Sequence, residues 1–156
     1  MERKLILLVE DDPQECELTK LALEKTGIPR DVDMVHDGAE LVDYLFSTGA
    51  YANRNHSRHP HLILLDLKMP KLDGLQVLRM LRRTRRHDNE TPPPVVVLTS
   101  SDEKEDIAEA YELGANSYIR KPIDFMAFSA TVQRLAEYWL SVNEPPPRFD
   151  HRTKIA

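Results

Sequence analysis

Residues 62–74 read LILLDLKMPKLDG, in which four aliphatic residues lead directly into Asp66. A continuous apolar run of this kind is typical of a strand that is covered on both faces, as in a parallel sheet. A carboxylate at the end of such a strand is costly unless a positive charge pairs with it. The rest of the chain is therefore expected to supply a partner for Asp66.

Short apolar runs alternate with segments of helical period on both sides of this stretch. The predicted strands are residues 4–9, 32–36, 62–67, 95–100 and 117–119. A helix is expected after each of them, and no part of the chain contains strands alone. This alternation predicts an α/β fold with a mainly parallel sheet, in which ligands collect at the carboxyl ends of the strands.

Capping residues and glycines set the predicted limits of the first two helices. Pro13 fits the first turn of the first helix, and Gly27 ends it. Asp37 and Glu40 have the spacing of a capping box before a second helix, which is expected to end near Gly49.

The later helices are also expected to begin at polar residues. Asp73 is predicted to cap the third helix, and either Ser101 or Asp102 the fourth. Asp124 starts the last helix, which carries an apolar stripe predicted to be core: Phe125, Phe128, Val132 and Leu135.

Length and composition indicate one globular domain without a membrane span. Of the 156 residues, 41% are hydrophobic, and the net charge of −5 argues against partners such as nucleic acid or an anionic membrane. No apolar run approaches the roughly 20 residues of a membrane span, so a cytoplasmic protein is expected. The domain is expected over residues 1–142, with a polar, proline-rich tail over residues 143–156. The single cysteine, Cys16, lies between Glu15 and Glu17, which disfavour a thiolate, so it is expected to be a helix residue and not a nucleophile.

The predicted strands end in side chains that suit one another chemically: Glu10, Asp11 and Asp12 after the first, Asp66 after the third, Thr99 in the fourth and Lys121 after the fifth. Carboxylates about 4 Å apart repel by roughly 4 kcal/mol per pair at an effective dielectric constant near 20. Oxygen ligands favour Mg²⁺, and no cysteine and histidine set points to zinc. A carboxylate acceptor, a divalent cation, a hydroxyl and an ammonium group together make a phosphoryl-transfer site.

Four motifs in this order resemble the signature of response-regulator receiver domains: VEDD at 9–12, LLDLKMPKLDG at 64–74, VLTS at 97–100 and YIRKP at 118–122. The resemblance runs from about residue 4 to residue 140. It implies a doubly wound, flavodoxin-like fold, with a five-stranded parallel sheet of order 2-1-3-4-5 and helices on both faces. The long insert before the third strand and the ending EYWLSVNEPPP are similar to small regulators paired with phytochrome-type histidine kinases.

The resemblance implies a role for each residue that matches a motif. Asp66 would be the phosphoacceptor. Asp11 would bind Mg²⁺ directly, together with Asp66 and the backbone carbonyl of Lys68. Glu10 would hold a metal-bound water, and Asp12 would be an additional helper.

The remaining matched residues would contact the phosphoryl group or respond to it. Thr99 and Lys121 would bind the phosphoryl oxygens, and the bond between Lys121 and Pro122 is one for which a cis form is expected to be tolerated. Tyr118 matches an aromatic switch residue that moves inward when Thr99 shifts toward the phosphate. Lys68 and Ser101 are expected to tune the lifetime of the phosphoryl group.

Three functions stay open on the sequence alone. The first is a phosphorylation-controlled regulator, with a histidine kinase, such as a bacteriophytochrome, and a second copy of itself as partners. Trp139 and Leu140 either meet that second copy or pack on the sheet. The second is a phosphatase of haloacid-dehalogenase type, which would need an acid where Lys68 stands. The third is an adaptor that does not depend on phosphorylation.

Two other groups have simpler interpretations than binding sites. Three histidines lie in a polar loop and are better explained as solvated residues than as metal ligands: His56, His59 and His61. Four arginines lie at a charged helix end, with docking to an acidic partner as the alternative: Arg82, Arg83, Arg85 and Arg86.

Overall fold

The computed structural model describes residues 3–54, 59–69, 73–88 and 92–146, without the side chains of residues 84–88. Its strands are β1 (Lys4–Val9), β2 (Arg30–Val35), β3 (Leu62–Leu65), β4 (Val95–Thr99) and β5 (Ser117–Arg120). Its α-helices are α1 (Pro13–Lys25), α2 (Gly38–Phe46), α3 (Gly74–Asp88), α4 (Lys104–Glu112) and α5 (Phe125–Glu137), with a 3₁₀ turn at Gly49–Tyr51 and a π-helical segment at Tyr138–Val142. Among these described segments, none is both long and apolar enough to cross a membrane.

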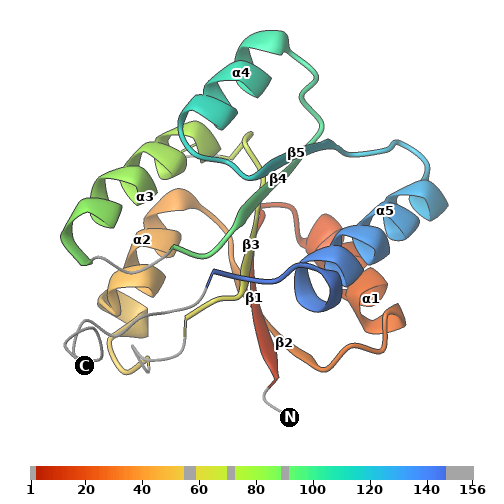
Figure 1. Cartoon of the computed structure of the whole chain (residues 1–156), viewed down its shortest axis with the longest axis horizontal. Helices are drawn as coiled ribbons and strands as arrows, with labels where there is room; N and C mark the ends of the chain where they lie inside the picture. Colours follow the sequence, from red (N-terminus) through yellow and green to blue (C-terminus); the bar gives the residue numbers. More distant parts are fainter. Residues whose placement is uncertain (1–2, 55–58, 70–72, 89–91, 147–156) are drawn as a thin grey trace.

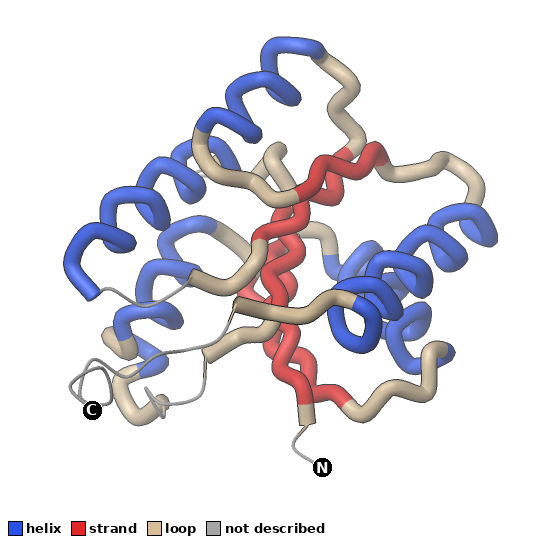
Figure 2. Tube along the Cα trace, viewed as in Figure 1, coloured by secondary structure: helices blue, strands red, loops and turns tan. Residues whose placement is uncertain are grey.

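The five strands form one parallel sheet in the order β2-β1-β3-β4-β5, as predicted. Figure 1 shows α1 and α5 on one face of this sheet and α2, α3 and α4 on the other. The tube in Figure 2 shows the twisted sheet running through the middle of the molecule between the two helical layers. Because strand order reverses between β1 and β3, the carboxyl ends of these strands flank the switch point at which such sheets bind ligands.

The three central strands, β1, β3 and β4, are almost entirely apolar because each face of the sheet has its own core. In β1, Leu7 and Val9 belong to the cluster under α2, α3 and α4, whereas Ile6 and Leu8 belong to the cluster under α1 and α5. Successive side chains of a strand point to opposite faces, so a strand covered on both sides needs an unbroken apolar run. Each fully buried aliphatic side chain stabilises the fold by about 1.5–3 kcal/mol.

Side-chain caps fix where several helices begin. The Asp37 carboxylate accepts the N–H of Glu40 at 2.8 Å, which confirms the predicted start of α2. Asp73 accepts the N–H of Gln76 at 2.9 Å and donates its own N–H to the Gln76 side chain at 3.0 Å, a complete capping box at α3. Asp124 caps α5 as predicted.

The predicted cap of α4 was wrong. The cap position is Glu103, whose side chain makes no capping hydrogen bond, and the helix begins at Lys104. The Ser101 hydroxyl instead donates to the Asp106 carboxylate at 2.6 Å. The Asp102 carboxylate forms an ion pair with the Arg120 guanidinium group at 3.3 Å. Both predicted caps are therefore used elsewhere, and α4 starts later than expected.

The apolar stripe of α5 is core except at its first residue. Phe128, Val132 and Leu135 are buried, but Phe125 is 47% exposed, so the prediction for Phe125 was wrong. Phe125 opens the helix directly after its cap, at an end that extends beyond the buried cluster. Leu140 is buried and Trp139 packs against the same cluster, which favours packing on the sheet for this pair.

Two backbone expectations also differ from the structure. No peptide bond among the described residues is cis, so the one between Lys121 and Pro122 is trans, the form that X-Pro bonds favour by about 0.5–1 kcal/mol. Helix α2 ends at Phe46, and its C-cap residue, Ser47, adopts a left-handed conformation with φ of 51°, so the helix stops before the predicted end near Gly49. Gly27, with φ of 68°, follows the end of α1 as expected.

Candidate functional site

The strand register brings the predicted site residues to one edge of the sheet. Val9 lies opposite Leu65, so Glu10 and Asp66 leave the sheet side by side. The Asp66 N–H donates to the Val9 carbonyl at 3.1 Å, and the Lys121 N–H donates to the Thr99 carbonyl at 2.8 Å. Because all five strands are parallel, these four positions share the carboxyl edge, as the sequence predicted.

The Lys121 ammonium group lies among three carboxylates. Its Nζ is 2.8 Å from Glu10 Oε2, 2.6 Å from Glu15 Oε2 and 3.6 Å from Asp66 Oδ2. The Lys121 and Glu10 side chains are buried, so this pairing offsets a large desolvation cost. The charge partner that the sequence required for Asp66 is therefore present, but Asp66 shares it with two other acids.

Sequence reasoning missed Glu15 as a member of this site. Glu15 lies in the first turn of α1, and this helix begins at the same edge of the sheet at which β1 ends. Its position just after the acidic run at 10–12 was the available signal. The sequence offered no means of telling which way the first turn of α1 faces.

The protonation equilibria of this cluster reflect an excess of acids. Burial raises the pKa of Glu10, the ion pair with Lys121 offsets part of that rise, and the charge of Asp66 adds to it. Burial lowers the pKa of the Lys121 ammonium, but the charge of Asp66 and the hydrogen bonds to Glu10 and Glu15 outweigh burial and raise it overall. A divalent cation would relieve this excess of negative charge.

The donor atoms present fit such a cation. One carboxylate oxygen from each of Glu10, Glu15 and Asp66 lies within 4.8 Å of the others. Asp11 is partly exposed next to Glu10 and is outside this group of three. Asp12 is exposed and accepts the Gln14 N–H at 2.9 Å, so its carboxylate caps α1. An oxygen-only set of this kind suits Mg²⁺ or a similar hard ion.

Thr99 and Tyr118 both contact the loop that follows β4. Thr99 is fully buried, and its hydroxyl oxygen lies 3.5 Å from the Ser101 N–H. The Tyr118 hydroxyl donates to the Ser101 carbonyl at 2.8 Å, and its ring packs against the cluster under α2, α3 and α4. Burial raises the pKa of Tyr118, which remains a hydrogen-bond donor. A shift of this loop would thus change the surroundings of both side chains.

The sequence matches the response regulator receiver domain family over residues 6–133. This chain belongs to that family. Membership makes it a signalling phosphoacceptor of a two-component system rather than an enzyme of the haloacid-dehalogenase type, and it implies a histidine kinase as partner. Receiver domains bind a divalent metal at an acidic site, and in this chain carboxylates of Glu10, Glu15 and Asp66 lie close together beside Lys121.

Three solved structures are similar to this chain over nearly its whole length. The crystal structure of the phosphorylated cyanobacterial phytochrome response regulator RcpA has a TM-score of 0.83 and 37% identity, covering 94% of this chain and 100% of that chain. The bacteriophytochrome response regulator RtBRR has a TM-score of 0.70 and 44% identity, covering 94% of this chain and 86% of that chain. The Mn²⁺-bound form of Rcp1, a protein of Synechocystis, has a TM-score of 0.81 and 33% identity, covering 92% and 99%.

Asp106, which the sequence also failed to indicate, joins two loops of the receiver domain. Its Oδ2 atom accepts the Ser101 hydroxyl at 2.6 Å and lies 3.2 Å from the Lys68 ammonium group. The hydrogen bond from Ser101 lowers the pKa of Asp106, burial opposes that effect, and Lys68 adds to the lowering. The backbone N–H of Lys68 lies 3.3 Å from an Asp66 carboxylate oxygen, so this network begins next to Asp66.

Asp106→Asn should lower the free energy of unfolding by about 1 kcal/mol at pH 7, because the ion pair with the exposed Lys68 is lost. The pKa of Asp106 is lowered in the folded state, so its stabilising effect is present above its ordinary value of 3.8 and is lost as the pH falls below it. Urea denaturation at pH 7 and near pH 3 should therefore show a difference from wild type that shrinks with acid. Glu105→Gln, an exposed change in the same turn, should differ from wild type by less than about 0.5 kcal/mol at both pH values.

Cys16 is buried in α1 and its thiol donates to the Glu10 carbonyl at 3.5 Å. Burial raises the pKa of this thiol to about 11, and the neighbouring charge of Glu10 adds to the rise. Cys16 is thus a helix residue of low reactivity, as the sequence predicted.

The described histidines do not form a metal site with one another. The Nδ1 atom of His61 accepts the Leu5 backbone N–H at 3.1 Å, and the backbone N–H of His61 donates to the Leu5 carbonyl at 2.7 Å. It is therefore tied to β1 and is not simply solvated, which corrects the prediction for His61. His56 lies outside the described residues.

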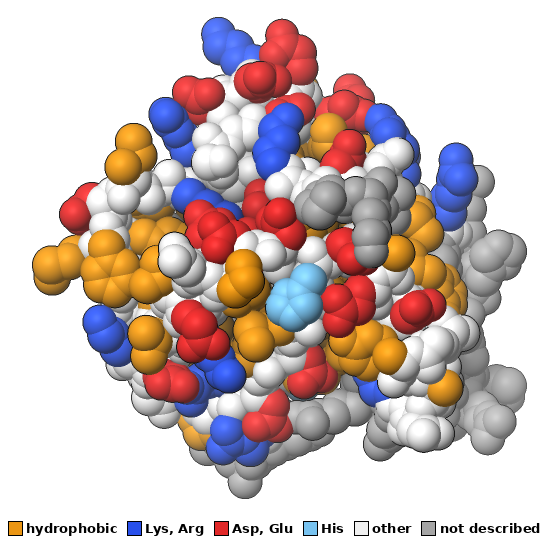
Figure 3. Space-filling view, turned by 180° about the vertical axis from the view of Figure 1, so that it is seen from behind, with side chains coloured by type: hydrophobic (Ala, Val, Ile, Leu, Met, Phe, Trp, Pro, Cys, Tyr) orange, Lys and Arg blue, Asp and Glu red, His pale blue; other side chains and the backbone are white. Residues whose placement is uncertain are grey.

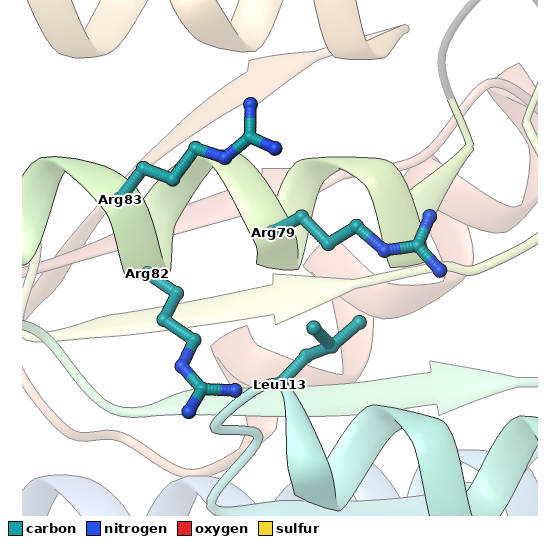
Figure 4. Close-up of a pocket in the computed structure, with 4 residues that line it drawn as sticks. All are labelled: Arg79, Arg82, Arg83 and Leu113. Atoms are coloured by element: carbon teal, nitrogen blue, oxygen red, sulfur yellow. The ribbon is translucent and has the colours of Figure 1, made fainter.

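Three arginines in the middle of α3, which continues to Asp88, line a hollow of about 260 Å³ beside α4, shown in Figure 4: Arg79, Arg82 and Arg83, with Leu113. Arg82 donates to the Glu112 carbonyl at 2.8 Å, and Arg79 pairs with Glu109. A cation at the carboxyl end of a helix stabilises it, so the first role of Arg82 is to cap α4. The side chains of Arg85 and Arg86 lie outside the described residues.

Proposed function

We propose that Asp66 accepts a phosphoryl group from a histidine kinase in the presence of Mg²⁺. The single observation that carries this is the place of Asp66, at the carboxyl end of β3 with its carboxylate 3.6 Å from the Lys121 ammonium group. Bound Mg²⁺ would neutralise charge on the phosphoryl oxygens during transfer. Asp11, Asp66 and the Lys68 carbonyl would hold the ion, with Glu10 acting through water and Asp12 as an additional helper.

In this proposal side chains of this chain first position the phosphoryl group and then change conformation in response to it. Asp66 attacks the phosphorus, and the donor leaves with the electron pair of the broken bond. Lys121 and Thr99 bind the phosphoryl oxygens, and Tyr118 follows the movement of the loop after Thr99. Phosphorylation would thereby shift a two-state equilibrium. Their common contact with Ser101 supports the coupling of Thr99 and Tyr118.

Lys68 and Ser101 are proposed to set the lifetime of the phosphoryl group. Both side chains are held by the same Asp106 carboxylate, so neither is free to reorient alone while the network stands. The comparison of dephosphorylation rates in wild type and Asp106→Asn tests this proposal. Equal rates would contradict it.

The kinase is proposed to be of the phytochrome type. The support is the similarity of this chain to RcpA and RtBRR over nearly its full length. A phosphotransfer assay should show faster transfer from bilin-binding kinases than from kinases without a bilin. Equal or slower transfer from the bilin-binding group would remove the support for this pairing.

Self-association is proposed as the means of output. Figure 3 shows hydrophobic side chains gathered at one margin of the molecule, on the side where the turned view places α5. Exposed apolar residues at the two ends of this helix support it: Ile123, Phe125, Met126, Tyr138 and Val142. Light scattering should show a dimer, and a monomer at high concentration with and without a phosphate mimic would contradict the proposal.

The domain is proposed to end at residue 142, with residues 143–156 as a polar tail, of which 147–156 lie outside the described residues. Among residues up to 146, helix α5 and the π-helical segment that follows it supply the last residues of the buried cluster, ending with Leu140. A chain shortened to residue 142 should unfold at the same temperature as the full chain. A clear drop in unfolding temperature would place part of the tail within the folded unit.

The experiment that tests the proposed function is Mg²⁺-dependent labelling by a small acyl phosphate, followed by peptide mapping. We expect one phosphoryl group per chain at Asp66, and none when the metal is removed with a chelator. Label at another residue, or labelling that is unchanged without metal, would overturn the assignment. Equal partner affinity with and without a phosphate mimic would favour an adaptor.

A further inference from the structure

Glu15 makes the shortest contact with the central ammonium group of the site. Its carboxylate lies 2.6 Å from Lys121 Nζ, compared with 2.8 Å for Glu10 and 3.6 Å for Asp66. Two of the three N–H donors of Lys121 thus point to Glu10 and Glu15. Asp66, the acceptor under the proposed function, is beyond direct hydrogen-bond distance.

The three carboxylates differ in how easily they can leave this arrangement. The Glu10 and Asp66 side chains are 5% and 9% exposed, whereas the Glu15 side chain is 37% exposed. A carboxylate that moves from a buried site must find a new partner, but one at the surface can be solvated by water. Glu15 is therefore the acid that can release Lys121 at the lowest cost.

We infer that Glu15 is a positioning residue that holds Lys121 before phosphorylation and competes with the phosphoryl group for it. The inference rests on the proposed function of Asp66. A phosphoryl group on Asp66 carries strong acceptor oxygens and roughly 1.5–2 negative charges in place of the single charge of the Asp66 carboxylate, so the negative charge next to Glu15 increases. Lys121 must turn toward these oxygens, and like-charge repulsion then drives Glu15 outward. Release of Glu15 would also break a link between the end of β5 and the first turn of α1.

Three substitutions separate this role from a general effect of charge. Glu15→Gln removes the charge and weakens the contact. Glu15→Asp keeps the charge but withdraws the carboxylate by one methylene group. Glu17→Gln, exposed on the same helix, makes the same change in net charge away from Lys121 and serves as the control.

The measurement is the affinity for beryllium fluoride, a phosphoryl mimic, by calorimetry at saturating Mg²⁺. We expect Glu15→Gln to bind the mimic about tenfold more tightly than Glu17→Gln, because a charge-assisted hydrogen bond no longer competes for Lys121. Glu15→Asp should also bind more tightly than wild type. Equal affinity of Glu15→Gln and Glu17→Gln, or wild-type affinity of Glu15→Asp, would overturn the inference.

The affinity for Mg²⁺ alone distinguishes the inferred role from metal ligation. The two Glu→Gln variants should bind Mg²⁺ equally well, and a specific loss in Glu15→Gln would make Glu15 a metal ligand and overturn the competition. Labelling of wild type at Asp66 tests the proposed function separately. If wild type is labelled but the variants do not differ, only the Glu15 inference fails. If wild type takes no label, the proposed function fails and the inference fails with it.

Discussion

Asp66→Asn should take up no detectable label from a small acyl phosphate, a loss on the order of a thousandfold or more. An amide oxygen is not a nucleophile under these conditions, and Lys121 would then face a neutral group. The fold should be at least as stable as wild type, because one of the three acids around a single ammonium group has been neutralised while Glu10 and Glu15 remain. Intact-mass spectrometry measures the label, and urea denaturation measures stability.

Asp73→Asn is the matched control for this substitution. Asp73 is exposed and caps α3, and asparagine is an equally good cap, so both labelling and stability should be unchanged. Labelling of Asp66→Asn at the wild-type rate would show that the acceptor has been assigned wrongly. A clear loss of stability would show that Asp66 stabilises Lys121 more than it repels its neighbours.

Gly74→Ala should lower the free energy of unfolding by about 2–3 kcal/mol. A Cβ atom at this position would lie 2.5 Å from the Asp66 carbonyl oxygen and 2.7 Å from the Leu67 Cα atom, so backbone has to move. The displaced segment carries Asp66, the proposed phosphoacceptor, and labelling of Asp66 should therefore also slow down, by at least about tenfold. Urea denaturation and the rate of labelling give the two readouts.

Gly27→Ala provides the comparison, because it shares the change of residue but not the clash. Gly27 has a φ of 68° and nothing within 4 Å of an added Cβ, so only the left-handed conformation is penalised, by about 1 kcal/mol. Labelling should be unaffected, since this glycine follows α1 at the end opposite Asp12. A Gly74→Ala variant with wild-type stability would show that the segment after β3 can shift without cost.

The sheet and the acids at its edge were predictable because they follow from local rules. Unbroken apolar runs such as 62–65 occur where a strand is buried on both faces, and the βα alternation leaves a parallel sheet as the simplest arrangement. Parallel strands then bring Asp66, Thr99 and Lys121 to one edge, whatever the details of packing. The order of the strands came from the resemblance to a known family.

The contacts that sequence reasoning missed depend on how helices are turned against the sheet. Glu15 and Asp106 lie in the first turns of α1 and α4, and only the packed structure decides that they face Lys121 and Lys68. Ser101 was expected to cap a helix because serine favours that role, but a buried carboxylate competed for its hydroxyl. Phe125 was expected in the core because periodicity does not show where the core ends.

The shielded thiol of Cys16 gives this chain a practical advantage for following its motions. Since this sulfhydryl is buried, a cysteine introduced at an exposed position such as Ala108 or Arg134 becomes the preferred point of attachment for a fluorophore or spin label. Probes on α4 and α5 can then be compared in otherwise native protein, without first replacing the natural sulfur.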